Sequence, residues 1–225
     1  MVQVNDYSIK LLETLVRIPS LSGYEQKIAK KGRLSLMKKK RTYKKAKERY
    51  DEKYYDEIIN KNRLIYLYDL IDDGSSENVN KKLLGMYLRN KKPITIEINS
   101  PGGDCCQGLS IIDTIERIKK AGGKVYTIIT GSACSMGSVI SIVGSKRFMS
   151  KNAYYMMHPM VLWNNDYLPF VKDRVRFAEE LYKRIIAIYR ENTKLPEDII
   201  KQAMHGEIWL TAEECLKYGV IDKIL

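Results

Sequence analysis

The sequence predicts an α/β protein built from parallel βαβ units, and three observations support this. First, from Arg63 to Gly144, segments with the texture of strands alternate with segments that have the period of helices. That alternation is the pattern of a parallel sheet covered by helices. Second, a glycine pair, Gly102-Gly103, directly follows one of the strands. Third, Ser135 lies between another strand and an apolar run that predicts a helix. Small residues therefore mark the points where strands give way to helices.

Composition limits the class of protein. The 225 residues suffice for one domain with a core and an appendage, and 44% hydrophobic with 29% charged residues indicate a globular chain. No apolar run approaches the ~18 residues of a membrane span, and the opening lacks a basic-then-apolar signal layout. The four cysteines form no Cys-x-x-Cys spacing and only two histidines are present. We therefore expect a cytoplasmic protein that has no membrane contact, bound metal or cofactor.

The N-terminal part differs from the rest of the chain. Residues 1–26 predict a short amphipathic helix that is stopped by Pro19 and Gly23. Residues 27–53 hold thirteen Lys and Arg against three acidic residues, a net charge of +10. Such a charge run favours a solvated helical extension, with contact to nucleic acid, an acidic partner or an acidic membrane surface as the alternative. We therefore expect residues 1–60 to be an extension and residues 61–225 to form the main domain.

From Arg63 to Thr130 the expected elements alternate regularly. The expected strands are Leu64–Tyr68, Pro93–Ile98 and Lys124–Thr130. The expected helices are Val79–Leu88, after a cap at Asp72–Ser76, and a segment with apolar residues at Leu109, Ile111, Ile112, Ile115 and Ile118. Asn99–Gly103 is expected to be the turn between the second strand and its helix.

After Ser135 the elements become shorter, with one exception. An apolar run from Val139 to Val143 predicts a helix, and short strands are expected at Lys146–Met149 and Ala153–Met157. The exception is a long amphipathic helix over Phe170–Asn192. The remaining expected elements are a helix beginning near Pro196, a helix over Thr211–Tyr218 that ends at Gly219, and a last strand over Val220–Leu225.

Serine-based acyl transfer requires a base near the serine and N–H donors where the oxyanion forms. Ser135 at a helix N-terminus is suited to be the nucleophile, although a helix cap is the common role of such a serine. His158 follows a strand and precedes a proline, which places it at the rim of a sheet, where it is either a base or a structural residue. Ala133 occupies the position of the first glycine in Gly-x-Ser-x-Gly, which disfavours the α/β-hydrolase fold.

Four short motifs occur in one order along the chain and resemble those of the Clp protease proteolytic subunit (ClpP) family. The resemblance covers Arg63–Leu225. The motifs are Asn99–Gly103, Ala133–Gly137, Met156–Pro159, and Trp209–Glu214 together with Tyr218–Asp222.

The resemblance implies a ClpP/crotonase-like fold of stacked parallel βαβ units with a protruding long helix that mediates ring stacking. It implies that Ser135 is the nucleophile, that His158 is the general base, and that the backbone N–H groups of Gly103 and Met136 form the oxyanion hole. It further implies a serine endopeptidase, a hydrolase of peptides or unfolded segments, that assembles into a homo-oligomeric ring. A separate ATP-driven unfoldase is the implied partner.

The chain departs from the family pattern in three places. Glu207 stands where the family usually has the aspartate of its triad, so we assign Glu207 to orient His158, with Asp166 or Asp222 as substitutes. His205 lies in the segment that leads to Glu207 and is not assigned as the base. Cys134 replaces a small residue and is expected to pack. The basic extension replaces the family's pore-lining N-terminus, which leaves unfoldase docking open.

Other functions remain compatible with the sequence. A phage-type head-maturation protease would use the same domain, and a catalytically inactive ClpP-like structural subunit would retain the fold alone. An enoyl-CoA hydratase relative would use the paired N–H groups without a Ser–His pair. A peptidase with a lysine base is disfavoured because His158 is present.

Overall fold

The computed structural model describes residues 57–161 and 167–225. The chain divides into two units, Met1–Asn62 and Arg63–Leu225. The elements below belong to the second unit. The helix expected within residues 1–26 and the basic segment 27–53 lie outside the described residues, as does Asp166. In the described part of the chain, no helix is long and apolar enough to cross a membrane.

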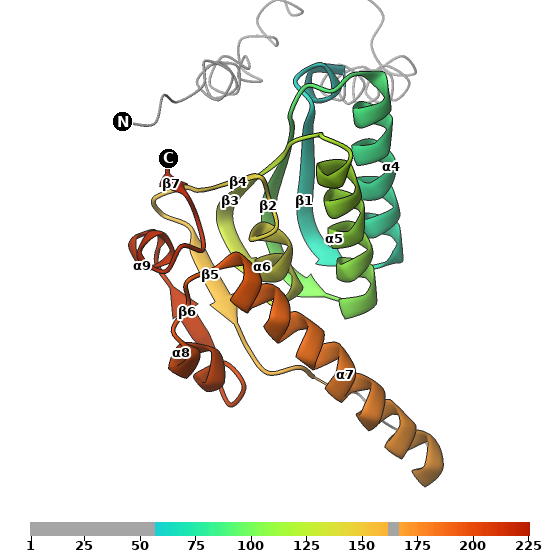
Figure 1. Ribbon diagram of the computed structural model, residues 1–225, viewed down its shortest axis with the longest axis vertical. Coiled ribbons are helices and arrows are strands. Elements are labelled where there is room, and N and C mark those ends of the chain that lie inside the picture. Colours follow the sequence, from blue (N-terminus) through green and yellow to red (C-terminus); the bar gives the residue numbers. More distant parts are fainter. Residues whose placement is uncertain (1–56, 162–166) are drawn as a thin grey trace, which may run out of the picture. The chain divides into compact units, whose positions relative to one another are not determined.

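A mostly parallel sheet forms the centre of the second unit (Figure 1). Its main path runs β1-β2-β3-β4-β7, and all four neighbouring pairs are parallel. These strands are β1 (Leu64–Ile71), β2 (Ile94–Gly103), β3 (Val125–Cys134), β4 (Lys146–Met149) and β7 (Lys223–Ile224). Helices α4 (Asp73–Arg89) and α5 (Cys105–Lys120) lie side by side against it (Figure 1). The predicted α/β fold is confirmed.

Local sequence explains why these segments form strands and helices. In β2 the fully buried Ile94, Ile96 and Ile98 alternate with residues that face the other side of the sheet. Asp72 begins α4 through a capping box with Ser75. β2 does not end at Ile98 as expected, because after a register shift its pairing with β1 continues through Gly103.

β3 pairs with two different strands along its length. Residues 126–129 pair with β4, and residues 132–134 pair with β5 (Tyr154–Met157). β5 in turn pairs antiparallel with β6 (Ile208–Leu210), a strand that the sequence reasoning did not predict. Helix α6 (Met136–Ser141) begins directly after β3. The end of β3 therefore lies where β5 and α6 meet.

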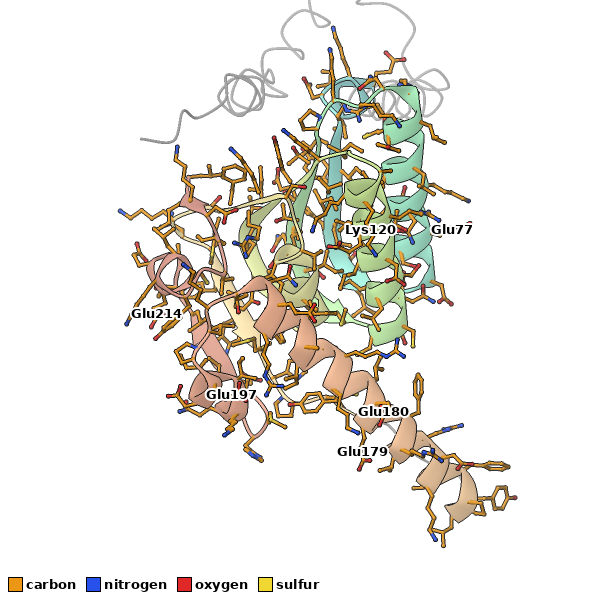
Figure 2. All side chains as sticks on the ribbon, in the orientation of Figure 1. Glu77, Lys120, Glu179, Glu180, Glu197 and Glu214 are labelled. Carbon is orange, nitrogen blue, oxygen red and sulfur yellow. The ribbon has the colours of Figure 1, made fainter. Side chains whose placement is uncertain are left out.

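The C-terminal part contains the long helix and two short ones. α7 (Leu168–Asn192) protrudes from the unit, as the predicted long helix was expected to do (Figure 1). α8 (Glu197–Gln202) is joined to the end of α7 by an ion pair between Arg190 and Glu197, a residue labelled in Figure 2. α9 (Ala212–Lys217) begins at its N-cap, Thr211.

Arg63 stabilises the junction between α4 and β2. Its side chain is almost completely buried, with 5% exposed. The guanidinium donates hydrogen bonds to four backbone carbonyls, those of Met86, Asn90, Lys92 and Pro93, at 2.8 to 3.3 Å. One side chain thereby joins the last turn of α4 to the turn that follows it, where the carbonyl of Met86 also accepts from the backbone N–H of Asn90.

Candidate active site

Ser135 has an unusual backbone conformation at the junction of β3 and α6. Its φ of 52° and ψ of −125° place a non-glycine residue in a sparsely populated region that costs about 1–3 kcal/mol. It occupies the N-cap position of α6, yet its side chain makes no capping hydrogen bond. The hydroxyl of Ser135 therefore does not serve the helix, unlike that of a typical serine cap.

Backbone hydrogen bonds fix both peptide groups of Ser135. Its N–H donates to the carbonyl oxygen of Met156 on β5 at 2.9 Å. Its carbonyl accepts from the N–H of Ser138 at 3.0 Å and from that of Val139 at 3.3 Å. Because Met136 is the first residue of α6, its N–H has no acceptor within that helix.

The glycine pair at the end of β2 brings backbone close to Ser135. A Cβ atom placed on Gly102 would lie 2.4 Å from the Cβ of Ser135 and 3.0 Å from its Oγ. Gly102 also has a φ of +98°, which favours glycine. A Cβ on Gly103 would lie 2.2 Å from the carbonyl oxygen of Ile71 in β1. Only glycine therefore allows this segment to pass between β1 and Ser135.

His158 follows β5 and lines the same cavity as Ser135. The cavity measures about 530 Å³, and Gly103, Ser135, Met136 and His158 all contribute to its lining. The Nδ1 of His158 lies 2.6 Å from the carbonyl oxygen of Pro159. Since a carbonyl can only accept, Nδ1 carries a proton in this contact, and Nε2 is the acceptor of a neutral imidazole.

The rest of the cavity wall is mainly apolar. α7 contributes Leu181, Tyr182 and Ile185, and Met160 adds a flexible apolar side chain. Two thiols, Cys105 and Cys106, also line the cavity, and Cys106 is exposed. Burial, with a smaller contribution from Asp104, raises the pKa of Cys105 to about 11, so this thiol stays protonated near neutral pH.

Cys134 precedes Ser135 and is buried, as expected for a packing residue. Burial is the main cause that raises the pKa of its thiol, and Glu207 adds to the effect. The thiol of Cys134 is therefore a poor nucleophile next to the serine.

Glu207 lies beside His158 in the strand register but is hydrogen-bonded elsewhere. Met157 pairs with Ile208 in the antiparallel β5–β6 ladder, so His158 and Glu207 are the next facing positions. The exposed carboxylate of Glu207 accepts a hydrogen bond from the indole N–H of Trp209 at 2.9 Å. Within residues 57–161 and 167–225, no hydrogen bond joins His158 to Glu207 or to Ser135.

Two other residues named from the sequence, Asp222 and His205, are among the described residues and have other surroundings. Asp222 forms an ion pair with Arg147 at 2.7 Å, and the backbone N–H of Arg147 also donates to its carboxylate. His205 is exposed and does not line the cavity. Glu207 is therefore the described carboxylate that the strand register brings next to His158.

This arrangement defines the class of protein. Three features meet at one apolar cavity: a serine whose hydroxyl does not cap its helix, a histidine with an acceptor nitrogen, and N–H groups in close-packed backbone. Acyl transfer by a serine hydrolase requires such a combination.

Comparison with known proteins is consistent with this class and identifies the family. The chain matches the Clp protease family over residues 46–225. It is 34% identical, over 72% of its length and 86% of the relative's, to the ATP-dependent Clp protease proteolytic subunit 1 of Chlamydia pneumoniae. It is also 34% identical to the ATP-dependent Clp protease proteolytic subunit of Lactococcus lactis, over 73% of this chain and 84% of the relative. The chain therefore belongs to the Clp protease family and is a serine-type peptidase.

Proposed function

We propose that this protein is a serine endopeptidase that cleaves peptide bonds with Ser135, His158 and Glu207 through an acyl-enzyme intermediate. The observation that supports it best is the hydroxyl of Ser135. Ser135 occupies the N-cap position of α6, but its hydroxyl makes no capping hydrogen bond. It also lines the same cavity as His158.

In the proposed mechanism, Ser135 Oγ attacks the scissile carbonyl while Nε2 of His158 accepts its proton. The same proton then passes to the leaving amine. The backbone N–H groups of Gly103 and Met136 donate to the oxyanion, and water releases the acyl half with His158 again as the base. The apolar wall from α7 excludes water around these charges, which strengthens the interactions with them.

Glu207 is proposed to orient the imidazole of His158. In the described structure the proton on Nδ1 is directed to the carbonyl of Pro159, and Glu207 binds Trp209. Glu207 therefore has to exchange the indole N–H for the Nδ1 proton when the substrate binds. His158 and Glu207 adjoin the last pair of the β5–β6 ladder, Met157 and Ile208, so we expect rotation of the two side chains to be enough for this exchange.

The setting of this activity is also a proposal. The relatives are named ATP-dependent, so a separate ATP-driven unfoldase is the proposed partner, with peptides or unfolded segments as substrates. A homo-oligomeric ring and a cytoplasmic location follow from the same resemblance. Residues 1–60 are proposed to be an extension apart from the catalytic domain 61–225.

Labelling with a fluorophosphonate probe tests the proposed function. We expect mass spectrometry to locate the probe on Ser135, to find none in Ser135→Ala, and to find unchanged labelling in Ser132→Ala. Ser132 is a matched control because it lies at the same end of β3. Absence of labelling in the folded wild type would reject the peptidase and favour an inactive ClpP-like structural subunit.

A further inference from the structure

A chain of buried hydroxyl groups connects α7 to the backbone of Ser135. The Oγ of Ser138, in α6, lies 2.6 Å from the carbonyl oxygen of Ser135. The same Oγ lies 2.7 Å from the phenol oxygen of Tyr189 on α7. A second phenol, that of Tyr155 on β5, donates to the carbonyl of Ser138 at 3.3 Å. Three elements thus meet at one serine next to the nucleophile.

The direction of these hydrogen bonds follows from the groups involved. A carbonyl can only accept, so the single proton of the Ser138 hydroxyl goes to the carbonyl of Ser135. The phenol of Tyr189 must then be the donor to Ser138 Oγ, because that hydroxyl has no further proton. The chain therefore runs one way, from Tyr189 through Ser138 to Ser135.

The environment makes these bonds specific. Ser138 and Tyr155 are fully buried and Tyr189 is 7% exposed, so water does not replace a missing partner. Burial raises the pKa of both phenols well above the usual value. Both phenols therefore remain protonated donors near neutral pH.

The carbonyl that receives this chain belongs to the residue under strain. Ser135 has a left-handed φ of 52°, which surrounding contacts must hold in place. The Ser138 hydroxyl adds a third donor to its carbonyl, beside the N–H groups of Ser138 and Val139. Tyr189 itself lines the cavity, together with Ile185 and Ile186 one turn before it in α7. Tyr189 thus connects the cavity wall to the nucleophile.

We infer that Ser138 and Tyr189 are positioning residues, which hold Ser135 in the conformation needed for attack and couple its geometry to α7. This inference rests on the proposed function. Neither residue is assigned contact with the substrate. Their effect is expected on the rate of reaction at Ser135, with substrate binding unchanged.

The test compares Ser138→Ala, Tyr189→Phe and the double variant with wild type. Fluorophosphonate labelling rates are measured together with kcat and KM for a short fluorogenic peptide, normalised to the folded fraction. Tyr126→Phe is the matched control. Tyr126 is also buried, with 5% of its surface exposed, and among the described residues its hydroxyl makes no hydrogen bond. A buried hydrogen bond contributes about 0.5–1.5 kcal/mol, which is roughly a 2- to 12-fold change in rate.

We expect Ser138→Ala to lower the labelling rate and kcat by about 3- to 10-fold and Tyr189→Phe by about 2- to 5-fold, with KM within twofold. In the Ser138→Ala background, Tyr189→Phe should add less than about twofold, because it acts through the missing hydroxyl. Tyr126→Phe should match wild type.

Other outcomes separate the possible errors. If the rate losses of Ser138→Ala and Tyr189→Phe multiply in the double variant, the two residues act independently and the proposed coupling is wrong. If Tyr189→Phe reacts at the wild-type rate but is less stable, Tyr189 has a structural role only. If Ser138→Ala does not fold, the ratio of Tyr189→Phe to Tyr126→Phe decides the question. A wild type that does not react rejects the proposed function and this inference with it.

Discussion

Replacement of Gly102 by alanine tests whether the close approach of β2 to Ser135 is needed for the reaction. The added Cβ would lie 2.4 Å from the Cβ of Ser135 and 2.8 Å from the carbonyl oxygen of Cys134. Carbon atoms in ordinary contact are about 3.5–4.0 Å apart. Ser135 or β2 must therefore move by roughly 1 Å, and misplacement on that scale costs about 100-fold in rate.

A second glycine provides a control that separates the effect of this contact from the effect of backbone strain. Gly122 has a φ of +82°, similar to the +98° of Gly102, but a Cβ at Gly122 would have no neighbour within 4 Å. Both alanine variants therefore carry the left-handed cost of about 1–2 kcal/mol. Only Gly102→Ala adds the collision with Ser135.

The assay is the fluorophosphonate labelling rate, normalised to the folded fraction by circular dichroism, with urea unfolding in parallel. We expect Gly122→Ala to label at the wild-type rate while losing about 1–2 kcal/mol of stability. Gly102→Ala should lose more stability and label about 100-fold more slowly. Equal labelling rates in the two variants would refute the role given to this contact.

Three further predictions concern the triad, the fold and pH. Glu207→Gln should lower kcat at least about tenfold with little change in KM, because glutamine does not stabilise the imidazolium of His158 as a carboxylate does; steady-state kinetics beside exposed Glu213→Gln checks this, and equal kcat values would remove Glu207 from the triad. Arg63→Lys should cost about 2–4 kcal/mol in urea unfolding, since one ammonium cannot reach the four carbonyls bound by the guanidinium; a loss no larger than in exposed Arg89→Lys would contradict this. Burial, and to a lesser extent Glu214, raises the pKa of Cys215 from 9.0 to about 12. As pH rises, the thiol therefore loses its proton in the unfolded chain before it does so in the folded protein. The free energy of unfolding is expected to fall between about pH 9 and 12. Between pH 8 and 10.5, the urea midpoint should fall less in Cys215→Ala than in wild type. An equal fall in both proteins would contradict this prediction.

The alternation of strands and helices along the chain could be predicted from the sequence because local signals determine it. Buried isoleucines in β2 and the cap at Asp72 act within a few residues, and the expected strand Lys146–Met149 coincides with β4. β6 was missed because Ile208–Leu210 is only three residues long. What makes it a strand is pairing with β5, more than fifty residues earlier, and such pairing leaves no local pattern.

The site could be predicted in its backbone positions but not in its side-chain contacts. The expected strands that became β3 and β5 end shortly before Ser135 and His158, so the positions of these two residues could be predicted. The hydrogen bond between Glu207 and Trp209 depends on how these two side chains rotate, which residue order does not determine. Tyr189 appeared only as one apolar position of the long helix. Its partner Ser138 is 51 residues away, so a tyrosine among aliphatic residues was the sole signal.

The exposed thiol in the cavity wall has a consequence for inhibitor chemistry. Cys106 lines the same cavity as Ser135 and is open to solvent. A reagent with a phosphonate at one end and a mild thiol-reactive group at the other meets two different nucleophiles in a single cavity. Serine hydrolases without a cysteine at this place offer only one of them. The pair of side chains thus provides a chemical handle by which a compound can be made selective for this protein.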